Sequence, residues 1–147
     1  MVTMTAAVAR TPGTEFELLD VELDEPRDDE VLVRILAVGI CHTDLNALSG
    51  RLPVQLPMIL GHEGSGIVEQ VGSQVTTVRP GDKVVISPDF CGTCTQCRLG
   101  HTAYCELSGI LVFGGIRRDG TTKASHRGEP VRAAFFGQSS FAQYSLV

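Results

Sequence analysis

Several features are missing from the sequence, and each absence argues against a class of function. There is no run of lysine or arginine and the formal net charge is −5, so a nucleic-acid-binding surface is not expected. No apolar stretch approaches the length of a membrane span. Residues 1–13 carry no basic segment followed by an apolar one, so no export signal is predicted. We therefore expect a cytoplasmic location and neither nucleic acid nor membrane as a partner.

Nucleotide-binding loops are missing as well. No Gly-x-Gly-x-x-Gly motif follows a predicted strand and opens a helix, so the sequence carries no dinucleotide-binding (Rossmann) fingerprint. The glycines of residues 61–66 do not open a helix and no Lys-Ser or Lys-Thr follows them, which argues against a phosphate-binding loop. With 43% hydrophobic and 20% charged residues among 147, the composition is that of one globular domain with a buried core.

The pattern of turns and short apolar segments predicts a mainly β fold. Sixteen glycines and seven prolines indicate many turns and few long helices. One short helix is expected from Thr43 or Asp44 to about Leu48, with a hairpin tip at Arg117–Gly120. Strands are expected at 5–10, 16–23, 31–40, 67–72, 84–86, 135–136 and 141–147. This predicts an all-β barrel or sandwich, and the strand-like character of the last residues leads us to expect a longer parent protein.

Four of the five cysteines are clustered in a short segment. Cys91, Cys94 and Cys97 are separated by gaps of two residues, and Cys105 follows after a gap of seven. Zinc takes four thiolates in closed structural sites, and Cys-x-x-Cys pairs commonly supply them. Disulfides, a redox pair and inert buried thiols are alternatives. The odd number of cysteines argues against disulfides, and four cysteines are more than a redox pair needs. The clustering argues against inert buried thiols. The spacing therefore predicts a structural zinc site.

A second group of candidate ligands lies earlier in the chain. Cys41 follows a predicted strand at a break marked by glycine, and His62-Glu63 lies in another such break. Cysteine and histidine at strand ends are a plausible half of a metal site. The alternative is that Cys41 is a small buried apolar group and His62 a core histidine with its hydrogen bonds satisfied. The residues alone leave both interpretations open.

The motifs together resemble those of a known family, the medium-chain zinc alcohol dehydrogenases. They occur in that family's order, with about its spacings, over essentially the whole chain. They are Gly39-Ile40-Cys41-His42-Thr43-Asp44, Gly61-His62-Glu63-Gly64-Ser65-Gly66, Arg79-Pro80-Gly81-Asp82-Lys83-Val84 and the loop with the clustered cysteines. Within the family, the segments 41–45, 60–64 and 135–141 are most similar to NAD-dependent aryl-alcohol (benzyl alcohol) dehydrogenases.

The resemblance implies a fold and a set of metal ligands. Residues 1–147 would form the N-terminal part of a GroES-like catalytic domain, a partly open β-barrel with a structural-zinc loop and few short helices. Cys41 and His62 would bind a catalytic zinc, and Glu63 would be able to approach it. The family's third protein ligand, a cysteine, has no counterpart here and is expected beyond the last residue, as is the Rossmann cofactor domain. We therefore expect weak or empty occupancy of the catalytic site in the fragment alone.

The resemblance also implies a reaction. Zinc would lower the pKa of a bound primary alcohol, so that the alkoxide passes a hydride to NAD or NADP and leaves as an aldehyde. Thr43 would take the alcohol proton, Asp44 would orient the histidine ligand and His42 would meet the cofactor pyrophosphate. In several relatives a histidine further along this helix passes the proton on to solvent. The aligned position here is Asn46, which cannot accept a proton near neutral pH. The parent enzyme would be a homodimer or homotetramer, and this fragment alone would be inactive.

Two rival interpretations remain. The chain could be a zinc-stabilised GroES-like binding or interaction module without catalysis, because a fold does not fix a function. It could also resemble the quinone oxidoreductases of the same superfamily, which lack zinc. The four clustered cysteines and Cys41 argue against that branch. Polyol and thiol-adduct dehydrogenases remain alternative substrate classes.

Overall fold

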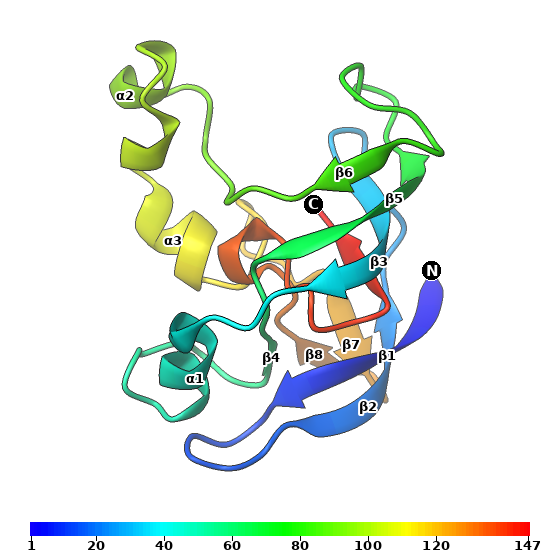
Figure 1. Cartoon of the computed structure of the whole chain (residues 1–147), viewed down its shortest axis with the longest axis vertical. Helices are drawn as coiled ribbons and strands as arrows, with labels where there is room; N and C mark the ends of the chain where they lie inside the picture. Colours follow the sequence, from blue (N-terminus) through cyan, green and yellow to red (C-terminus); the bar gives the residue numbers. More distant parts are fainter.

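The computed structural model describes all residues, 1–147, and consists of two antiparallel sheets that curl into a partly open barrel (Figure 1). The five-stranded sheet has the order β4 (Met58–Ile59), β1 (Val2–Ala9), β2 (Glu17–Leu23), β7 (Ala124–His126) and β8 (Glu129–Val131). The four-stranded sheet has the order β6 (Lys83–Val85), β5 (Gly64–Val71), β3 (Val31–Val38) and β9 (Tyr144–Leu146). The sequence-based prediction of a mainly β, partly open barrel is confirmed.

The core lies between the two sheets. Along β1 the side chains of Met4, Ala6 and Val8 are buried while those of Thr3 and Thr5 are exposed, which is the period of two expected for a strand with one buried face. An eleven-residue apolar cluster joins this face to residues of β2, β3 and β9. A second apolar cluster joins β1 and β4 to the helical segments that contain Ala47 and Phe135. Its buried residues are Ala9, Ala47, Met58, Leu60 and Phe135.

The helices are few and short, as predicted. They are α1 (His42–Leu48), α2 (Thr95–Arg98), α3 (Ser108–Phe113) and the single 3₁₀ turns η1 (Thr102–Tyr104) and η2 (Phe135–Gly137). No helix of the chain has the length and apolar character needed to span a bilayer. Helices α2 and α3 belong to a lobe that projects from the sheets, above α1 in the view of Figure 1. We call residues 91–113 the cysteine lobe.

One local prediction was wrong, and several elements were not predicted. Phe135–Phe136 was expected to be strand, but it forms η2, in which Phe136 has φ 54° and ψ 27°. The predicted tight turn at Arg117–Gly120 is present, since the Gly120 N–H donates to the Arg117 carbonyl (3.0 Å) and the Arg117 N–H donates to the Thr121 carbonyl (2.8 Å). The hairpin that joins β7 and β8 turns at Arg127–Gly128 and was not predicted. Both turn residues have positive φ, 52° and 82°, as a type I′ turn requires. Helices α2 and α3 were not predicted either.

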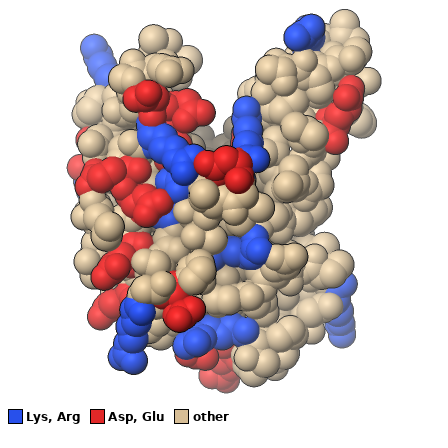
Figure 2. Space-filling view, turned by 180° about the vertical axis from the view of Figure 1, so that it is seen from behind, with Lys and Arg blue, Asp and Glu red and all other residues tan.

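Ion pairs connect the loop between β2 and β3 to the segment that follows the cysteine lobe. The Arg117 guanidinium donates from Nε to Glu30 Oε1 (2.6 Å) and from Nη2 to Glu30 Oε2 (3.1 Å). A third bond runs from Nη1 to Asp24 Oδ2 (2.8 Å). Burial raises the pKa of Glu30, but hydrogen bonds from Arg117 and from the Arg27 backbone N–H outweigh it and leave that pKa lowered. Seen from behind, charged side chains gather beside a deep notch in the surface (Figure 2).

Candidate functional site

The pairing of β3 with β5 brings two candidate ligand segments to one edge of the sheet. Val38, the last residue of β3, is paired with Gly64, the first residue of β5. The pairing continues one step further, because the backbone N–H of Gly39 donates to the carbonyl of Glu63 (3.1 Å). Antiparallel register therefore places the residues after β3 beside the residues before β5. Cys41 and His62 lie in these two segments.

Cys41 is the N-cap residue of α1. Its backbone is extended (φ −103°, ψ 155°), and Asp44 at the N3 position accepts a hydrogen bond from its N–H (3.1 Å). The Thr43 hydroxyl lies 3.5 Å from Cys41 Sγ. Hydrogen bonding from that hydroxyl, and then from the Thr43 backbone N–H and from His62, lowers the pKa of the Cys41 thiol. The start of α1 thus favours a thiolate at this position.

The Asp44 carboxylate holds the two segments together. It is fully buried, and besides the Cys41 N–H it accepts the backbone N–H of Gly61 (3.0 Å) and Nδ1–H of His62 (3.1 Å) on Oδ1. These three bonds come from two separate segments of the chain, Cys41 and Gly61-His62, and they satisfy the buried carboxylate. With Nδ1 donating to Asp44, the free Nε2 lone pair is left to bind an ion, the arrangement typical of metal-ligating histidines.

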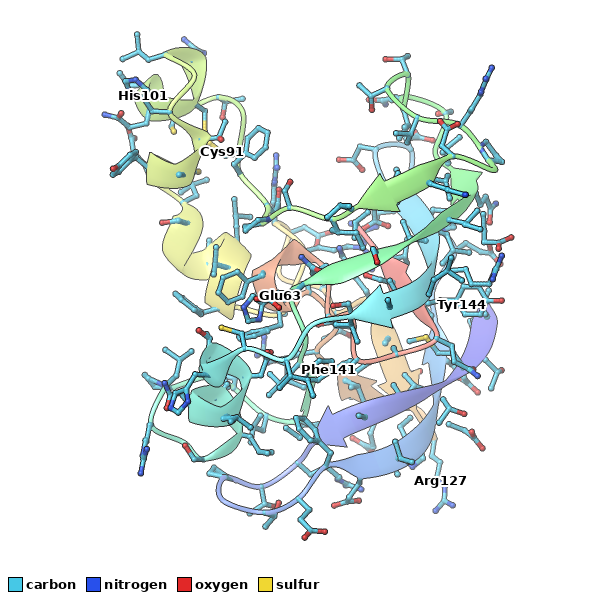
Figure 3. All side chains as sticks on the ribbon, in the orientation of Figure 1. Glu63, Cys91, His101, Arg127, Phe141 and Tyr144 are labelled. Carbon is cyan, nitrogen blue, oxygen red and sulfur yellow. The ribbon has the colours of Figure 1, made fainter.

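The ligand atoms of Cys41, His62 and Glu63 converge. All three lie within 4.8 Å of one another. Glu63 is exposed, and in Figure 3 it lies in the gap between α1 and α3. Gly39 leaves the room for this carboxylate, because a Cβ at position 39 would collide with Glu63 Oε2. Gly61 has φ +87°, and a Cβ there would lie 2.6 Å from the backbone nitrogen of Phe141.

This donor set fits a zinc ion. One thiolate, one imidazole and one carboxylate are all ligands that zinc accepts, and catalytic zinc sites use three protein ligands and keep one position open. The short mutual distances, the oriented histidine and the lowered pKa of Cys41 all favour binding of a divalent cation. Both loops are partly exposed, so an incoming molecule has access.

Aromatic rings surround His62, and sequence reasoning missed their role. The Phe136 ring is stacked on the imidazole, with centroids 4.3 Å apart and planes 21° apart. Phe135 meets it edge-on at 5.7 Å, and Phe113 from α3 meets Phe136 edge-on at 5.5 Å. The only signal in the sequence was the pair of adjacent phenylalanines, Phe135 and Phe136. A pair of this kind is equally common in a buried strand, so it did not indicate contact with His62.

The clustered cysteines form a separate group in the cysteine lobe. The sulfurs of Cys91, Cys94, Cys97 and Cys105 all lie within 4.8 Å of one another, and Cys91 and Cys97 are 3.9 Å apart. That separation is too long for a disulfide of about 2.05 Å. It is close to the edge, about 3.8 Å, of a tetrahedron with zinc–sulfur bonds of about 2.3 Å. The geometry of the four sulfurs therefore suits one tetrahedral metal ion.

Backbone N–H groups point at these sulfurs. Thr93 and Cys94 donate to Cys91 Sγ (3.4 and 3.3 Å), and Cys91 donates to Cys105 Sγ (3.3 Å). The two bonds to Cys91 lower the pKa of its thiol to about 6. Burial instead raises the pKa of Cys97 to about 12. All four cysteines can be thiolates together only if a cation lies between them to balance their negative charge. The backbone N–H groups are already placed to share that charge.

The remaining predicted positions lie apart from the ligand cluster. His42 is exposed on α1 and Asn46 is half-buried there. A cavity of about 460 Å³, lined in part by Ile86 and Ser87, lies beside the ion pairs of Arg117, and none of the three converging ligands lines it.

Comparisons with known proteins give a consistent result. The chain is 47% identical over 146 residues to the geraniol dehydrogenase of Castellaniella defragrans, covering 99% of this chain and 39% of that protein. It superposes on an alcohol dehydrogenase zinc-binding domain protein from Burkholderia ambifaria with a TM-score of 0.97 at 48% identity, covering 99% of this chain and 40% of the other. For the benzyl alcohol dehydrogenase of Acinetobacter calcoaceticus the TM-score is 0.92 at 43% identity, with coverage of 99% and 39%.

The extent of these matches defines what is shared. The chain spans about two fifths of the length of the relatives it matches, so what is shared is the region that carries the two ligand clusters. Residues 27–147 match the family described as the alcohol dehydrogenase GroES-like domain. The expected GroES-like fold is thereby confirmed, and the chain belongs to the alcohol dehydrogenase GroES-like domain family.

Proposed function

We propose that this chain is the N-terminal, zinc-binding part of the catalytic domain of an alcohol dehydrogenase. The whole protein would oxidise a primary alcohol to its aldehyde and transfer the hydride to a nicotinamide cofactor. The observation that carries the proposal is the convergence of Cys41, His62 and Glu63 within 4.8 Å, with His62 oriented by the buried Asp44. Membership of the GroES-like alcohol dehydrogenase family supports the same assignment.

Each residue of the site would have a definite task. A zinc ion bound there would supply Lewis acidity, which makes an alcohol proton easier to remove. Asp44 keeps His62 in the tautomer with Nε2 free, and Cys41 contributes a thiolate favoured by its hydrogen bonds. Thr43, beside Cys41, would receive the alcohol proton on its hydroxyl while releasing its own. Since the Asn46 amide is not basic, the proton would then pass to water.

The aromatic surroundings of His62 favour a flat, unsaturated substrate. The rings of Phe135 and Phe136 contact the His62 imidazole, and the Phe113 ring packs against both of them. Such rings pack well against a planar group. Two of the three named relatives are a geraniol dehydrogenase and a benzyl alcohol dehydrogenase, and both of these alcohols carry the hydroxyl-bearing carbon next to an unsaturated carbon. We therefore propose an aryl or allylic primary alcohol as the substrate.

The cofactor and the rest of the enzyme lie outside this chain. We propose NAD or NADP as the hydride acceptor, with the exposed His42 contributing to its pyrophosphate site. The fragment alone would be inactive, because no dinucleotide-binding fingerprint is present to hold the cofactor. We further propose a homodimeric or homotetrameric parent enzyme. The four clustered thiols would have to stay reduced, which supports the cytoplasm as its location.

Metal analysis of the full-length protein tests the proposal. Two zinc ions per chain are expected, and the variant Cys41→Ser should retain one of them and lose oxidation of benzyl alcohol and geraniol with either nicotinamide cofactor. The matched variant His126→Gln, in β7, should keep both ions and the activity. A wild-type protein with two ions but no activity toward any primary alcohol would refute the assignment of the reaction.

A zinc-stabilised interaction module is the second candidate. The cysteine lobe supports it, because its four sulfurs need only one ion and no catalytic residue. In that case the full-length protein would contain one zinc per chain, and Cys41→Ser would leave the metal content unchanged. The same measurement therefore separates the two functions.

A further inference from the structure

One hydrogen bond does not fix the orientation of the His62 ring. The bond from Nδ1 to Asp44 sets the direction of one ring edge. The χ2 torsion of histidine is broad, so the ring plane can still turn about that bond. A second contact is needed to aim Nε2 at the sulfur of Cys41 and the carboxylate of Glu63.

Phe136 supplies a contact of the required kind. Its ring lies nearly parallel to the imidazole, with centroids 4.3 Å apart and planes 21° apart. A parallel neighbour at this distance blocks rotation of the ring plane, whereas the edge-on ring of Phe135 at 5.7 Å closes a different side. Asp44 and Phe136 together therefore constrain both the direction and the plane of the imidazole.

The backbone of Phe136 has an unusual conformation that presents this ring. Its φ of 54° lies in the left-handed region, which residues with a side chain adopt rarely and at a cost. The turn is held from both sides: the N–H of Phe135 donates to Ser139 Oγ (2.8 Å), and Ser139 Oγ donates to the carbonyl of Ile59 (2.6 Å). Strain that the surroundings maintain in this way is concentrated at functional sites in proteins.

A third ring supports Phe136 from the cysteine lobe. Phe113 is the last residue of α3, and it meets Phe136 edge-on, with centroids 5.5 Å apart and planes 86° apart. Helix α3 begins three residues after Cys105, the last of the clustered cysteines. A continuous series of contacts therefore runs from the cysteine lobe through Phe113 and Phe136 to His62.

We propose that Phe136 is a positioning residue that sets the plane of the His62 imidazole for metal binding, and that Phe113 supports it from the cysteine lobe. The inference rests on the proposed function in one respect, namely that His62 binds a metal ion. Phe136 acts through His62 and need not touch the substrate.

The test measures metal affinity in the full-length protein. Cobalt(II) titration in competition with a chelator gives the dissociation constant at the site, and the cobalt absorption bands report the ligand geometry. Phe136→Leu should weaken binding about tenfold, the lower end of the effect of removing a group that orients a ligand. Phe136→Tyr, which retains the flat ring, should restore wild-type affinity and spectrum. Phe16→Leu is the matched control, since Phe16 packs edge-on against Phe141 and makes no ring contact with His62.

Phe113 provides a second, independent readout. Phe113→Leu should weaken cobalt binding by less than Phe136→Leu, and the double variant should bind no more weakly than Phe136→Leu alone. That non-additivity is expected of residues acting in series, whereas two independent packing defects would add. Phe136→Gly, which accepts a positive φ, guards against misfolding, since it removes the ring without keeping the strain.

The outcomes separate this inference from the proposed function. A wild-type protein that binds no cobalt through Cys41 would refute the proposed function. A wild-type protein that binds cobalt normally, with Phe136→Leu and Phe136→Gly retaining its affinity and spectrum, would overturn the positioning role alone. A loss of thermal stability in Phe136→Leu with unchanged affinity would also overturn it, because the residue would then be only part of the core.

Discussion

Replacing Asp44 by asparagine tests whether one buried carboxylate holds the proposed catalytic site in shape. The side chain is fully buried and accepts N–H groups of Cys41, Gly61 and His62 at 3.1, 3.0 and 3.1 Å. Asparagine has nearly the same shape but only one accepting oxygen. It can keep the bonds to Gly61 and His62 on that oxygen, and its amide group then faces the N–H of Cys41.

The magnitude follows from this mismatch. A buried N–H that loses its acceptor costs about 1–3 kcal/mol, so Asp44→Asn should lower the free energy of unfolding by that amount. The remaining bond to His62 loses its negative acceptor, which makes the imidazole a weaker ligand. Loss of such a partner typically lowers metal affinity about 10- to 100-fold. The metal effect should therefore exceed the effect on folding.

The assay combines urea unfolding with zinc titration against a chelator, both on the full-length protein. Asp82→Asn is the matched control, because Asp82 Oδ2 accepts the N–H of Arg79 (3.0 Å) three residues earlier, as Asp44 does for Cys41. That side chain is 40% exposed, and the control should change zinc affinity and stability little. If Asp44→Asn binds its second zinc as tightly as the wild type, the carboxylate does not orient the site and our reasoning fails.

Two further predictions concern pH and metal removal. The lowered pKa of Glu30 means that its ion pair stabilises the fold above the ordinary glutamate pKa and that this stability is lost as the pH falls through the folded value. Arg117→Leu should therefore cost about 3 kcal/mol or more near pH 7, and less as the pH is lowered and Glu30 protonates; Glu30→Leu in the same chain should recover most of the loss. Urea unfolding from pH 7 downward measures the free energy lost in Arg117→Leu. A loss that does not change with pH would contradict the role of the Glu30 carboxylate. Adding a chelator should speed amide hydrogen exchange in the cysteine lobe before the sheets, and equal exchange in both would count against a structural metal there.

The parts that the sequence predicted well are those determined by neighbouring residues. The spacing of the clustered cysteines is a local property, and the structure places all four sulfurs within 4.8 Å. The alternation of buried and exposed residues in β1 is equally local, since a strand with one buried face imposes it. The break after β3 at Gly39 was visible because glycine and a change of polarity coincide there. Such signals need no knowledge of the rest of the fold.

The parts that it missed or predicted wrongly depend on contacts between distant segments. Residues 108–113, Ser-Gly-Ile-Leu-Val-Phe, have the β-branched, apolar character of a strand, yet they form α3. The rings of Phe113, Phe135 and Phe136 pack together there, and this tertiary contact outweighs local propensity. The left-handed conformation of Phe136 likewise depends on Ser139, whose hydroxyl donates to the carbonyl of Ile59. Ile59 lies far away in the sequence. No pattern within the segment itself contains that information.

The two ligand clusters differ in how they are held, and this has a consequence for the proposed enzyme. In the cysteine lobe the sulfurs are supported mainly by the loop's own backbone N–H groups, so an ion is needed to balance their charge. At Cys41 and His62, sheet pairing and the Asp44 carboxylate hold the proposed ligands in place, and the Phe136 ring is stacked on the imidazole. A site whose ligands are fixed before the ion arrives loses little conformational freedom on binding. If zinc binds there as we propose, one ligand position could stay open for a substrate without loss of the geometry of the others.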